Sequence, residues 1–351
     1  MKTFFLGKEL KSPVIIGSGP SVYDGDSAAR LCRAGAGMAV TKTIRYEAWK
    51  SIPAHMTVSN GHSLVNCEGW SDLSLSQWIT DELPKAKQQG AVVAASLGLS
   101  EDEVRYAAPL VEQAGADFIE VVSYDSSTLP DMVKAVKEQV SIPVIAKISP
   151  NGGSWLKDAM RCELNGADAL TGFDSMGPAA VIDIETGSCA LGQKNGWLSG
   201  AAIRPFAVYR LMELAKSVHI PLIGLGGVYS GRNAIELMMA GASLVGVVSA
   251  VILNGEEYIA KILKELKEWM QKHNYTDVQQ LCGLAVEEKS GKRQTGSLQV
   301  NTVYCTKCGI CSRVCCYGAI RCTDGVRYDA AKCRRCGLCI SCCPKHCLKG
   351  F

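Results

Sequence analysis

The feature that most constrains this chain is a cysteine spacing that occurs twice between residues 300 and 351. Each run reads Cys-x-x-Cys-x-x-Cys-x-x-x-Cys. The first run comprises Cys305, Cys308, Cys311 and Cys315, and the second comprises Cys333, Cys336, Cys339 and Cys343. Three thiolates from one short loop can reach three metal atoms of a single cluster only where the chain wraps that cluster tightly. Zinc sites usually take four ligands in two pairs, so this spacing fits zinc poorly, and it fits a disulfide scaffold no better.

The repeated run resembles the cluster-binding sequence of bacterial ferredoxins, in which two copies hold two [4Fe–4S] clusters and the fourth Cys of each run binds the other cluster. Pro344 follows the second run as in that family, whereas Cys316 stands where proline is usual after the first. The expected ligand sets are Cys305, Cys308, Cys311 and Cys343 for one cluster, and Cys333, Cys336, Cys339 and Cys315 for the other. We therefore predict a protein that moves electrons.

The chain has 351 residues, and the roughly 300 that precede the cysteine-rich segment suit one large domain better than two. Five further cysteines are scattered singly, which is typical of small buried side chains in a reducing cytosol. No apolar run reaches about 18 residues, and the apolar stretch in MKTFFLGKEL is too short for a signal peptide. The sequence predicts a soluble, cytoplasmic protein with no membrane segment.

Positive charge is concentrated in residues 300–351, which hold nine Lys and Arg against two Asp. These charges lie between the expected cluster ligands and have no aromatic platform beside them, which argues against nucleic acid as a partner. We expect them to offset the charge of the ligated clusters and to attract an acidic electron carrier. No convincing nicotinamide-binding motif occurs, so the expected partner is an electron-donor flavoprotein subunit or a ferredoxin. A homo-oligomer stays open.

Apolar runs of five to eight residues, rich in Val and Ile, recur before residue 251 with helical patterns between them. The expected strands are 13–19, 37–43, 92–98, 118–124, 143–149, 169–175, 221–227 and 244–250. Continuous apolarity is typical of parallel strands buried on both faces. In three places a Gly ends a helix directly before a strand. Eight such units in about 270 residues predict an α/β fold, a (β/α)₈ TIM barrel, with a doubly wound open sheet as the alternative.

Two segments fall outside these repeats. Residues 46–88 are longer than a β/α unit needs, and we expect an insertion over the barrel mouth. Residues 287–299 are polar and lose the periodicity, which is typical of a linker. The predicted organisation is a barrel over 1–286, a linker over 287–299, and a small α+β domain of bacterial-ferredoxin type over 300–351.

Residues suited to an active site follow the ends of the expected strands, where barrels of this kind carry their chemistry. Gly226 and Gly227 end the seventh strand and let backbone N–H groups approach a phosphate, and Ser249 ends the eighth before a helix start. Lys42 and Lys147 close otherwise apolar strands, where a lysine is costly unless it meets an anion or an acceptor. Both are expected to face the barrel centre and to contact an electron-rich ligand such as a reduced flavin.

A series of motifs makes the resemblance more specific: PVIIGSG, GAGMAVTKT, SLVNCEGWS, IPVIAKISPN, LSGAAIRP, LIGLGGVYSG and VVSA, in this order. They resemble class 1 dihydroorotate dehydrogenases, and more closely dihydropyrimidine dehydrogenase, which joins an FMN barrel to a C-terminal two-cluster ferredoxin module. The resemblance covers nearly the whole chain and implies FMN across the barrel mouth. By that resemblance the FMN-binding residues are Ser18 and Gly19 beside the ring, Thr41, Lys42 and Lys147 in contact with it, and Gly200, Gly226, Gly227, Ser249 and Ala250 around the ribityl chain and phosphate.

The substrate-facing positions depart from that family. Its strand-4 motif, Asn-Leu-Ser-Cys-Pro-Asn or a close relative, reads Val-Ser-Tyr-Asp-Ser-Ser over 122–127. The proton-exchanging Cys or Ser of the family therefore has no clear counterpart, and Tyr124, Asp125 and Ser126 stay open as the proton donor. Asp125 could serve near neutral pH only if burial raised its pKa. The expected substrate-binding residues are Asn66 and Glu68, which match positions of the family, and Trp70, Asp174 and Ser175, which depart from it.

A pyrimidine pocket that loses matched hydrogen-bond partners leaves the polar edge of the ligand unpaired, which is costly. A larger or flatter molecule with a conjugated C=C bond suits the remaining residues better. We predict an FMN- and iron–sulfur-dependent oxidoreductase that reduces an activated C=C bond, taking hydride from flavin N5, a proton from a strand-4 loop acid, and electrons through two [4Fe–4S] clusters. The alternatives are a dihydropyrimidine or dihydroorotate dehydrogenase with an altered pocket, and a non-catalytic electron-transfer subunit.

Overall fold

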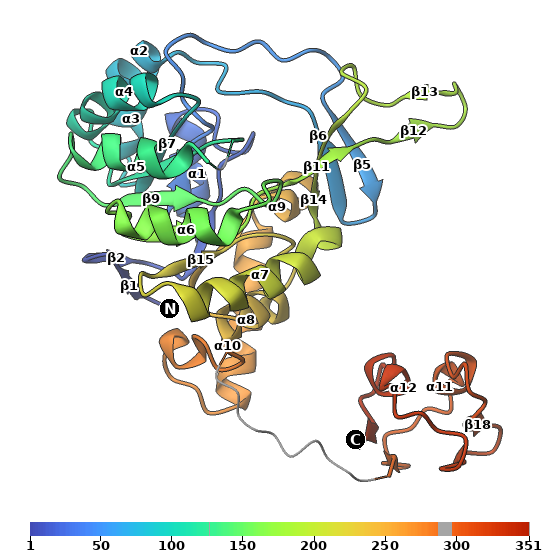
Figure 1. Cartoon of the computed structure of the whole chain (residues 1–351). Helices are drawn as coiled ribbons and strands as arrows, with labels where there is room; N and C mark the ends of the chain where they lie inside the picture. The colour runs from blue at the N-terminus through green and yellow to red at the C-terminus, as the bar shows by residue number, and fades with distance from the viewer. Residues whose placement is uncertain (126, 287–296, 351) are drawn as a thin grey trace. The chain divides into compact units, whose positions relative to one another are not determined.

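The computed structural model describes residues 1–125, 127–286 and 297–350. They belong to two compact units, Met1–Glu287 and Glu288–Phe351 (Figure 1). Among the described residues, every helix is too short or too polar to cross a membrane.

Eight parallel strands close into a barrel in the first unit (Figure 1). They are β3 (Val14–Ile16), β4 (Ala39–Val40), β7 (Val93–Gly98), β8 (Phe118–Val122), β9 (Val144–Lys147), β10 (Ala169–Thr171), β15 (Leu222–Gly224) and β16 (Ala242–Val247). The pairing of β16 with β3 closes the ring. Seven of these strands fall within the expected ranges, and β16 overlaps the range 244–250 but begins two residues before it. The predicted barrel is therefore confirmed and the open sheet is excluded.

The strands are mostly apolar because both of their faces are buried. Along β3, Val14 and Ile16 face the surrounding helices, whereas Ile15 belongs to a second cluster inside the barrel. A hairpin of β1 (Thr3–Phe5) and β2 (Lys8–Leu10) contributes Phe5 and Leu10 to that inner cluster. Because side chains alternate along a strand, each strand contributes both to the core inside the barrel and to the core between the barrel and the helices.

Helices follow the strands around the barrel. The longer ones are α1 (Gly25–Arg33), α4 (Glu101–Gln113), α5 (Leu129–Lys137), α6 (Trp155–Leu164), α7 (Arg204–Ser217), α8 (Gly231–Met239) and α10 (Tyr258–Lys272). Short ones are η2 (Ala201–Ile203), α9 (Ser249–Asn254) and η3 (Val278–Leu281). The helix-to-strand turns contain Gly115, Gly166 and Gly241 at φ of 100°, 94° and 121°. These left-handed conformations confirm the glycine turns expected from the sequence.

A four-stranded antiparallel sheet stands beside the barrel, in the order β11 (Met176–Ala179), β14 (Gly196–Gly200), β6 (Ser63–Asn66) and β5 (Met56–Asn60) (Figure 1). The hairpin of β12 (Ile182–Asp183) and β13 (Ser188–Cys189) extends from it. Only the first part of the expected insertion 46–88 joins this sheet. Its remainder forms α2 (Leu75–Gln77), η1 (Trp78–Glu82) and α3 (Leu83–Gln88), and α3 packs on α1 in the helical layer. The insertion is therefore shorter than predicted.

The second unit has an internally repeated layout. β17 (Gln299–Val300) pairs with β20 (Leu348–Lys349), and β18 (Ile320–Cys322) pairs with β19 (Val326–Tyr328). The short helices α11 (Ile310–Arg313) and α12 (Leu338–Ser341) each follow a Cys-x-x-Cys segment. Residues 287–296 of the expected linker lie outside the described residues, and Gln299, its last residue, is already in a strand.

Candidate active site and cysteine-lined cavities

A cavity of about 1170 Å³, counted out to its open mouth, lies where the barrel strands end at their C-terminal side. Most of the residues proposed from the sequence line it. They are Ser18, Gly19, Lys42, Asn66, Glu68, Trp70, Tyr124, Lys147, Asp174, Ser175, Gly200, Gly226, Gly227 and Ser249. The fold thus brings together side chains from β/α loops and from the neighbouring antiparallel sheet.

Two proposed FMN contacts do not line this cavity. Thr41 is fully buried, and its Oγ1 accepts a hydrogen bond from the Ser96 N–H at 2.9 Å. Ala250 is buried in the first turn of α9. Thr41 therefore supports the barrel wall through its hydroxyl, and neither residue offers a side chain to a ligand.

Lys147 ends β9 as a buried cation between two carboxylates. Its Nζ lies 3.4 Å from Glu120 Oε1 and 3.6 Å from Asp174 Oδ2. Burial pulls the pKa of Lys147 down, but the charges of Asp174 and Glu120 outweigh burial and leave that pKa raised. The second Glu120 oxygen accepts a hydrogen bond from Thr171 Oγ1 at 3.0 Å. Lys147 therefore stays charged at the floor of the cavity.

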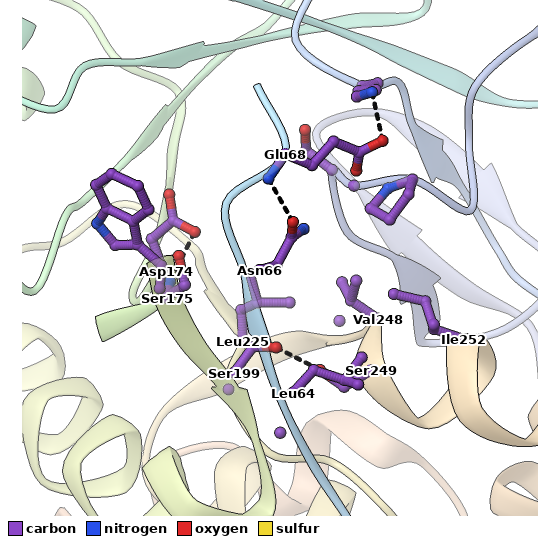
Figure 2. A pocket seen from close by; sticks show the side chains of 18 of the residues that line it. Leu64, Asn66, Glu68, Asp174, Ser175, Ser199, Leu225, Val248, Ser249 and Ile252 are labelled. Atoms are coloured by element: carbon purple, nitrogen blue, oxygen red, sulfur yellow. Dashed lines mark hydrogen bonds and ion pairs between the residues drawn. The ribbon is translucent and has the colours of Figure 1, made fainter. Parts of the chain in front are cut away.

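Lys42, which follows β4, is likewise a buried cation at the cavity with two carboxylate partners. Its Nζ donates to Glu68 Oε1 at 2.7 Å (Figure 2). It also donates to Asp72 Oδ1 at 2.9 Å. Lys42 is 4% exposed, so the ion pair with Glu68 fixes both charges at the cavity wall. Both lysines thus meet acceptors, which is what a lysine at the end of an apolar strand requires.

The antiparallel sheet supplies the wall opposite the barrel loops. Asn66 on β6 pairs across to Trp197 on β14. Asn66 Oδ1 accepts a hydrogen bond from the Glu68 N–H at 2.6 Å (Figure 2). Trp197 and Ser199 also line the cavity but were not proposed from the sequence. Their spacing of two residues in GWLSG, which puts both on one face of a strand, is the signal that would have found them.

Three aromatic side chains, Trp70, Tyr124 and Trp197, form what we call the aromatic wall. The Trp70 and Tyr124 ring centroids are 5.2 Å apart. Tyr124 stacks on Trp197 at 5.5 Å with 25° between the ring planes. Trp70 also lies under the Arg45 guanidinium at 5.8 Å. The Trp70 and Tyr124 ring planes are inclined by 46°, so the wall offers the cavity aromatic ring faces and edges, which suit contact with an aromatic or conjugated ligand.

The candidate proton donors differ in position. Asp125 is exposed and does not line the cavity. Its Oδ1 accepts hydrogen bonds from the Ser127 hydroxyl at 2.7 Å and the Ser127 N–H at 3.0 Å, and these bonds lower the pKa of Asp125. The raised pKa that an acid requires is therefore not found there. Ser126 lies outside the described residues. Tyr124 is 51% exposed but lines the cavity, and burial around its hydroxyl, together with the charge of Asp174, raises its pKa to about 12.

The loop after β15 offers backbone donors to an anion. Gly226 and Gly227 are buried with φ of 114° and 77°, a conformation that favours glycine. Within the described residues, their N–H groups have no hydrogen-bond acceptor. Buried backbone donors are rarely left without an acceptor, so a ligand oxygen fits here. Ser199 Oγ and Ser249 Oγ lie 2.9 Å apart in the same cavity (Figure 2). Together with the two glycine N–H groups, these hydroxyls provide the hydrogen-bond donors that a phosphate requires.

The predicted cluster ligands line two small cavities in the second unit. One is lined by Cys305, Cys308, Cys311 and Cys343, together with Cys322 and Cys347. The other is lined by Cys315, Cys333, Cys336 and Cys339. Among the described residues, no group of three or more His, Cys, Asp or Glu side chains is arranged to hold a single metal ion. In a [4Fe–4S] cube each thiolate binds a different iron, so thiols spread around a cavity fit a cluster better than a single ion.

The two cysteine loops repeat an unusual backbone. Lys307 and Arg335, each directly before the second Cys of its run, both have φ of 55°. Gly309 and Gly337, directly after that Cys, have φ of 73° and 79°. A non-glycine residue at positive φ is uncommon and costs free energy. Its occurrence at the same place in both loops indicates a shared requirement of the site.

Comparison with known proteins identifies the family of the first unit. The model of the family described as dihydroorotate dehydrogenase matches residues 1–270. The catalytic subunit of dihydroorotate dehydrogenase B (NAD(+)) from Methanothermobacter thermautotrophicus is 31% identical over 299 residues, covering 81% of this chain and 98% of the relative. Its counterpart from Methanosarcina acetivorans is 32% identical over 304 residues, covering 80% and 94%. The chain therefore belongs to the dihydroorotate dehydrogenase family, whose members are flavin-dependent oxidoreductases acting on a CH–CH bond.

Proposed function

We propose that this protein binds FMN in the barrel and two [4Fe–4S] clusters in the C-terminal unit, and that it reduces an activated C=C bond with electrons delivered through the clusters. One observation carries the proposal. The cavity at the strand ends combines backbone donors for a phosphate with two buried lysines and an aromatic wall. The nearer resemblance to dihydropyrimidine dehydrogenase, with its ferredoxin-type domain, is part of this proposal.

The residues present fit FMN. Gly200, Gly226, Gly227 and Ser249 would hold the ribityl chain and phosphate. Ser18, Gly19, Lys42 and Lys147 would lie along the ring, with Thr41 and Ala250 behind the ligand. Bound FMN would supply the exchange of a hydride equivalent with a carbon–carbon bond. Lys42 and Lys147 would keep positive charge beside the electron-rich ligand, and their carboxylate partners would hold them in place.

The C-terminal unit supplies the route for electrons in this proposal. The proposed ligands of one cluster are four of the six thiols that line the first cavity, Cys305, Cys308, Cys311 and Cys343. Those of the other are Cys315, Cys333, Cys336 and Cys339, which line the second cavity. Relatives are named as catalytic subunits of an NAD(+)-linked enzyme, which supports a separate electron-transfer subunit as the partner here. The nine Lys and Arg between residues 300 and 351 would attract an acidic donor protein.

Tyr124 is the proton donor we favour, and its removal should slow turnover without preventing binding. Tyr124→Phe is expected to lower kcat about 10²–10⁴-fold, the usual contribution of a general acid. Because the pKa of Tyr124 is raised to about 12, the phenol keeps its proton through pH 10. The wild-type pH–rate profile should therefore show no loss from this group until more alkaline pH. Asp125→Asn, which removes a carboxylate outside the cavity, is the matched control and should leave kcat within about threefold. Equal rates for Tyr124→Phe and wild type would exclude the assignment.

The aromatic wall should contribute to substrate affinity. Trp197→Ala removes a stacked ring at the cavity, and we expect KM for a planar conjugated substrate to rise about tenfold, because an aromatic pair is worth about 0.5–1.5 kcal/mol beyond its buried area. Trp269→Ala is the matched control, since Trp269 lies on α10, stacks on Tyr275 and does not line the cavity. An unchanged KM in Trp197→Ala would show that the substrate does not use the wall.

The substrate class is tested by anaerobic reoxidation. The reduced holoprotein is mixed with orotate, uracil and thymine, and in parallel with enones, steroids and aryl acrylates, while flavin and cluster absorbance are followed. We expect rapid reoxidation by one of the larger conjugated acceptors. Reoxidation by orotate alone would favour the second candidate, a dihydroorotate dehydrogenase with an altered pocket, which the names of the relatives support. Reoxidation by no acceptor would favour an electron-transfer subunit.

A further inference from the structure

The first cysteine-lined cavity contains two thiols that the proposed cluster does not need, Cys322 and Cys347, and Cys347 contacts an expected ligand. Cys347 lines it beside the four expected ligands and is 5% exposed. Its Sγ lies 3.3 Å from the Sγ of Cys343, which is within hydrogen-bonding distance for two sulfur atoms. A buried thiol in contact with an expected ligand can affect that ligand directly.

The internal repeat provides a built-in comparison. Cys347 follows Cys343 by four residues, and Ala319 follows Cys315 by four residues. Cys343 and Cys315 are the corresponding fourth cysteines of the two runs. The Ala319 N–H approaches Cys315 Sγ at 3.3 Å. The second run therefore places a thiol at the position where the first run has only a methyl group.

The direction of the hydrogen bond follows from the chemistry of the ligand. As an iron ligand Cys343 is a thiolate and has no proton to give, so the Cys347 S–H must donate and Cys343 Sγ must accept. Hydrogen bonds to cluster sulfurs are among the factors that set cluster potential. A donor to the thiolate stabilises the reduced cluster more than the oxidised one, because reduction adds negative charge.

We propose that Cys347 donates an S–H···S hydrogen bond to Cys343 and thereby raises the reduction potential of the cluster in the first cavity. The cluster in the second cavity, which has Ala319 at the matching position, lacks this donor. An electron shared between the two clusters is thereby biased toward the first. This inference rests on the proposed presence of two clusters, and it concerns their inequality.

Redox titration of the full chain, followed by electron paramagnetic resonance, tests the proposal. In Cys347→Ala we expect the midpoint potential of one cluster to fall, with a reduced-to-oxidised ratio a few-fold smaller at a fixed solution potential, because an S–H group is a weak donor and its hydrogen bond is present in both redox states. The other cluster and the iron content should not change. Cys347→Ser keeps a donor and should retain most of the potential. Ala319→Cys should raise the potential of the second cluster.

The outcomes separate this inference from the proposal on which it rests. Unchanged potentials in both Cys347→Ala and Ala319→Cys, with full iron content, would overturn the role of Cys347 while leaving the clusters in place. A wild-type protein without iron–sulfur clusters would overturn the proposed function itself. If Cys347→Ala loses its cluster, Ala319→Cys still decides, because it adds the thiol without removing one.

Discussion

Replacing Lys147 with methionine is expected to lower the free energy of unfolding of the barrel by about 3–5 kcal/mol, the usual cost of removing one partner from a buried ion pair. The Lys147 cation lies between Glu120 and Asp174, and Glu120 is 2% exposed. Without the lysine, two carboxylates would face each other with little water to separate them. All six Trp residues precede residue 287, so urea unfolding followed by Trp fluorescence reports on the barrel unit.

A matched variant shows what a less buried lysine contributes. Lys137 pairs with Asp168 at 2.8 Å, with both side chains about one-third exposed. Lys137→Met should therefore cost less than about 1 kcal/mol. The double variant Lys147→Met with Glu120→Gln should regain part of the loss, because it removes one of the unpaired charges. A Lys147→Met protein as stable as Lys137→Met would contradict the role given to Lys147.

The raised pKa of Lys147 also predicts a pH dependence. The folded protein binds the Lys147 proton more tightly than the unfolded chain does. This contribution to stability is therefore fully present below the unfolded lysine pKa of about 10.4, and it is lost as pH rises from there through the folded pKa. Between pH 6 and pH 9 the Lys147 proton should therefore contribute no pH dependence to the stability of the wild-type barrel, and the contribution should fall only above about pH 10. Urea unfolding of the wild type at a series of pH values measures this, and a Lys147 contribution already lost below pH 9 would contradict the raised pKa.

Two double variants should distinguish crossed from uncrossed cluster ligation by their iron content. Cys311→Ala with Cys315→Ala alters two cysteines of the first run. With crossed ligation these two cysteines bind different clusters, so each cluster loses one ligand. This double variant should lose both clusters and nearly all of about eight iron atoms. Cys315→Ala with Cys339→Ala alters two ligands of the same cluster and should keep about four. Iron and acid-labile sulfide are measured on protein purified anaerobically.

The control for these variants is Cys316→Ala. Cys316 is exposed and lines neither cysteine cavity, so this variant should keep its full iron content. If each run instead held its own cluster, the results of the two double variants would be exchanged. The variant altered within one run would then keep about four iron atoms, and the variant altered in both runs would lose all of them.

The barrel could be predicted from the sequence because its determinants are local. Parallel strands buried on both faces give continuous apolar runs, and the helix-to-strand turns require glycines such as Gly115, Gly166 and Gly241. The antiparallel sheet beside the barrel is much less evident in the sequence. Its strands β6 and β14 lie far apart in the chain, and the segment 176–200 lacks a clear apolar pattern. As a result Trp197 was not proposed, although it lies directly across from Asn66.

The candidate site shows the same limit for individual side chains. Lys42 and Lys147 could be proposed because charge is unusual at the end of a buried strand. The direction in which a loop side chain points depends on contacts within the loop, which the sequence does not reveal. From the sequence alone Asp125 is as suitable a proton donor as Tyr124, yet in the structure its carboxylate accepts two hydrogen bonds from Ser127. Likewise, the proximity of Cys347 to Cys343 depends on how the second run folds around its cavity.

The most direct test of an electron-transferring flavin barrel is a count of flavin and iron per chain after anaerobic purification. We predict about one FMN and about eight iron atoms, with matching acid-labile sulfide. FMN would be identified by chromatography after acid release, and metals by elemental analysis of the same sample. A protein that contains zinc in place of iron, or that binds no flavin when FMN is supplied, would contradict the proposal.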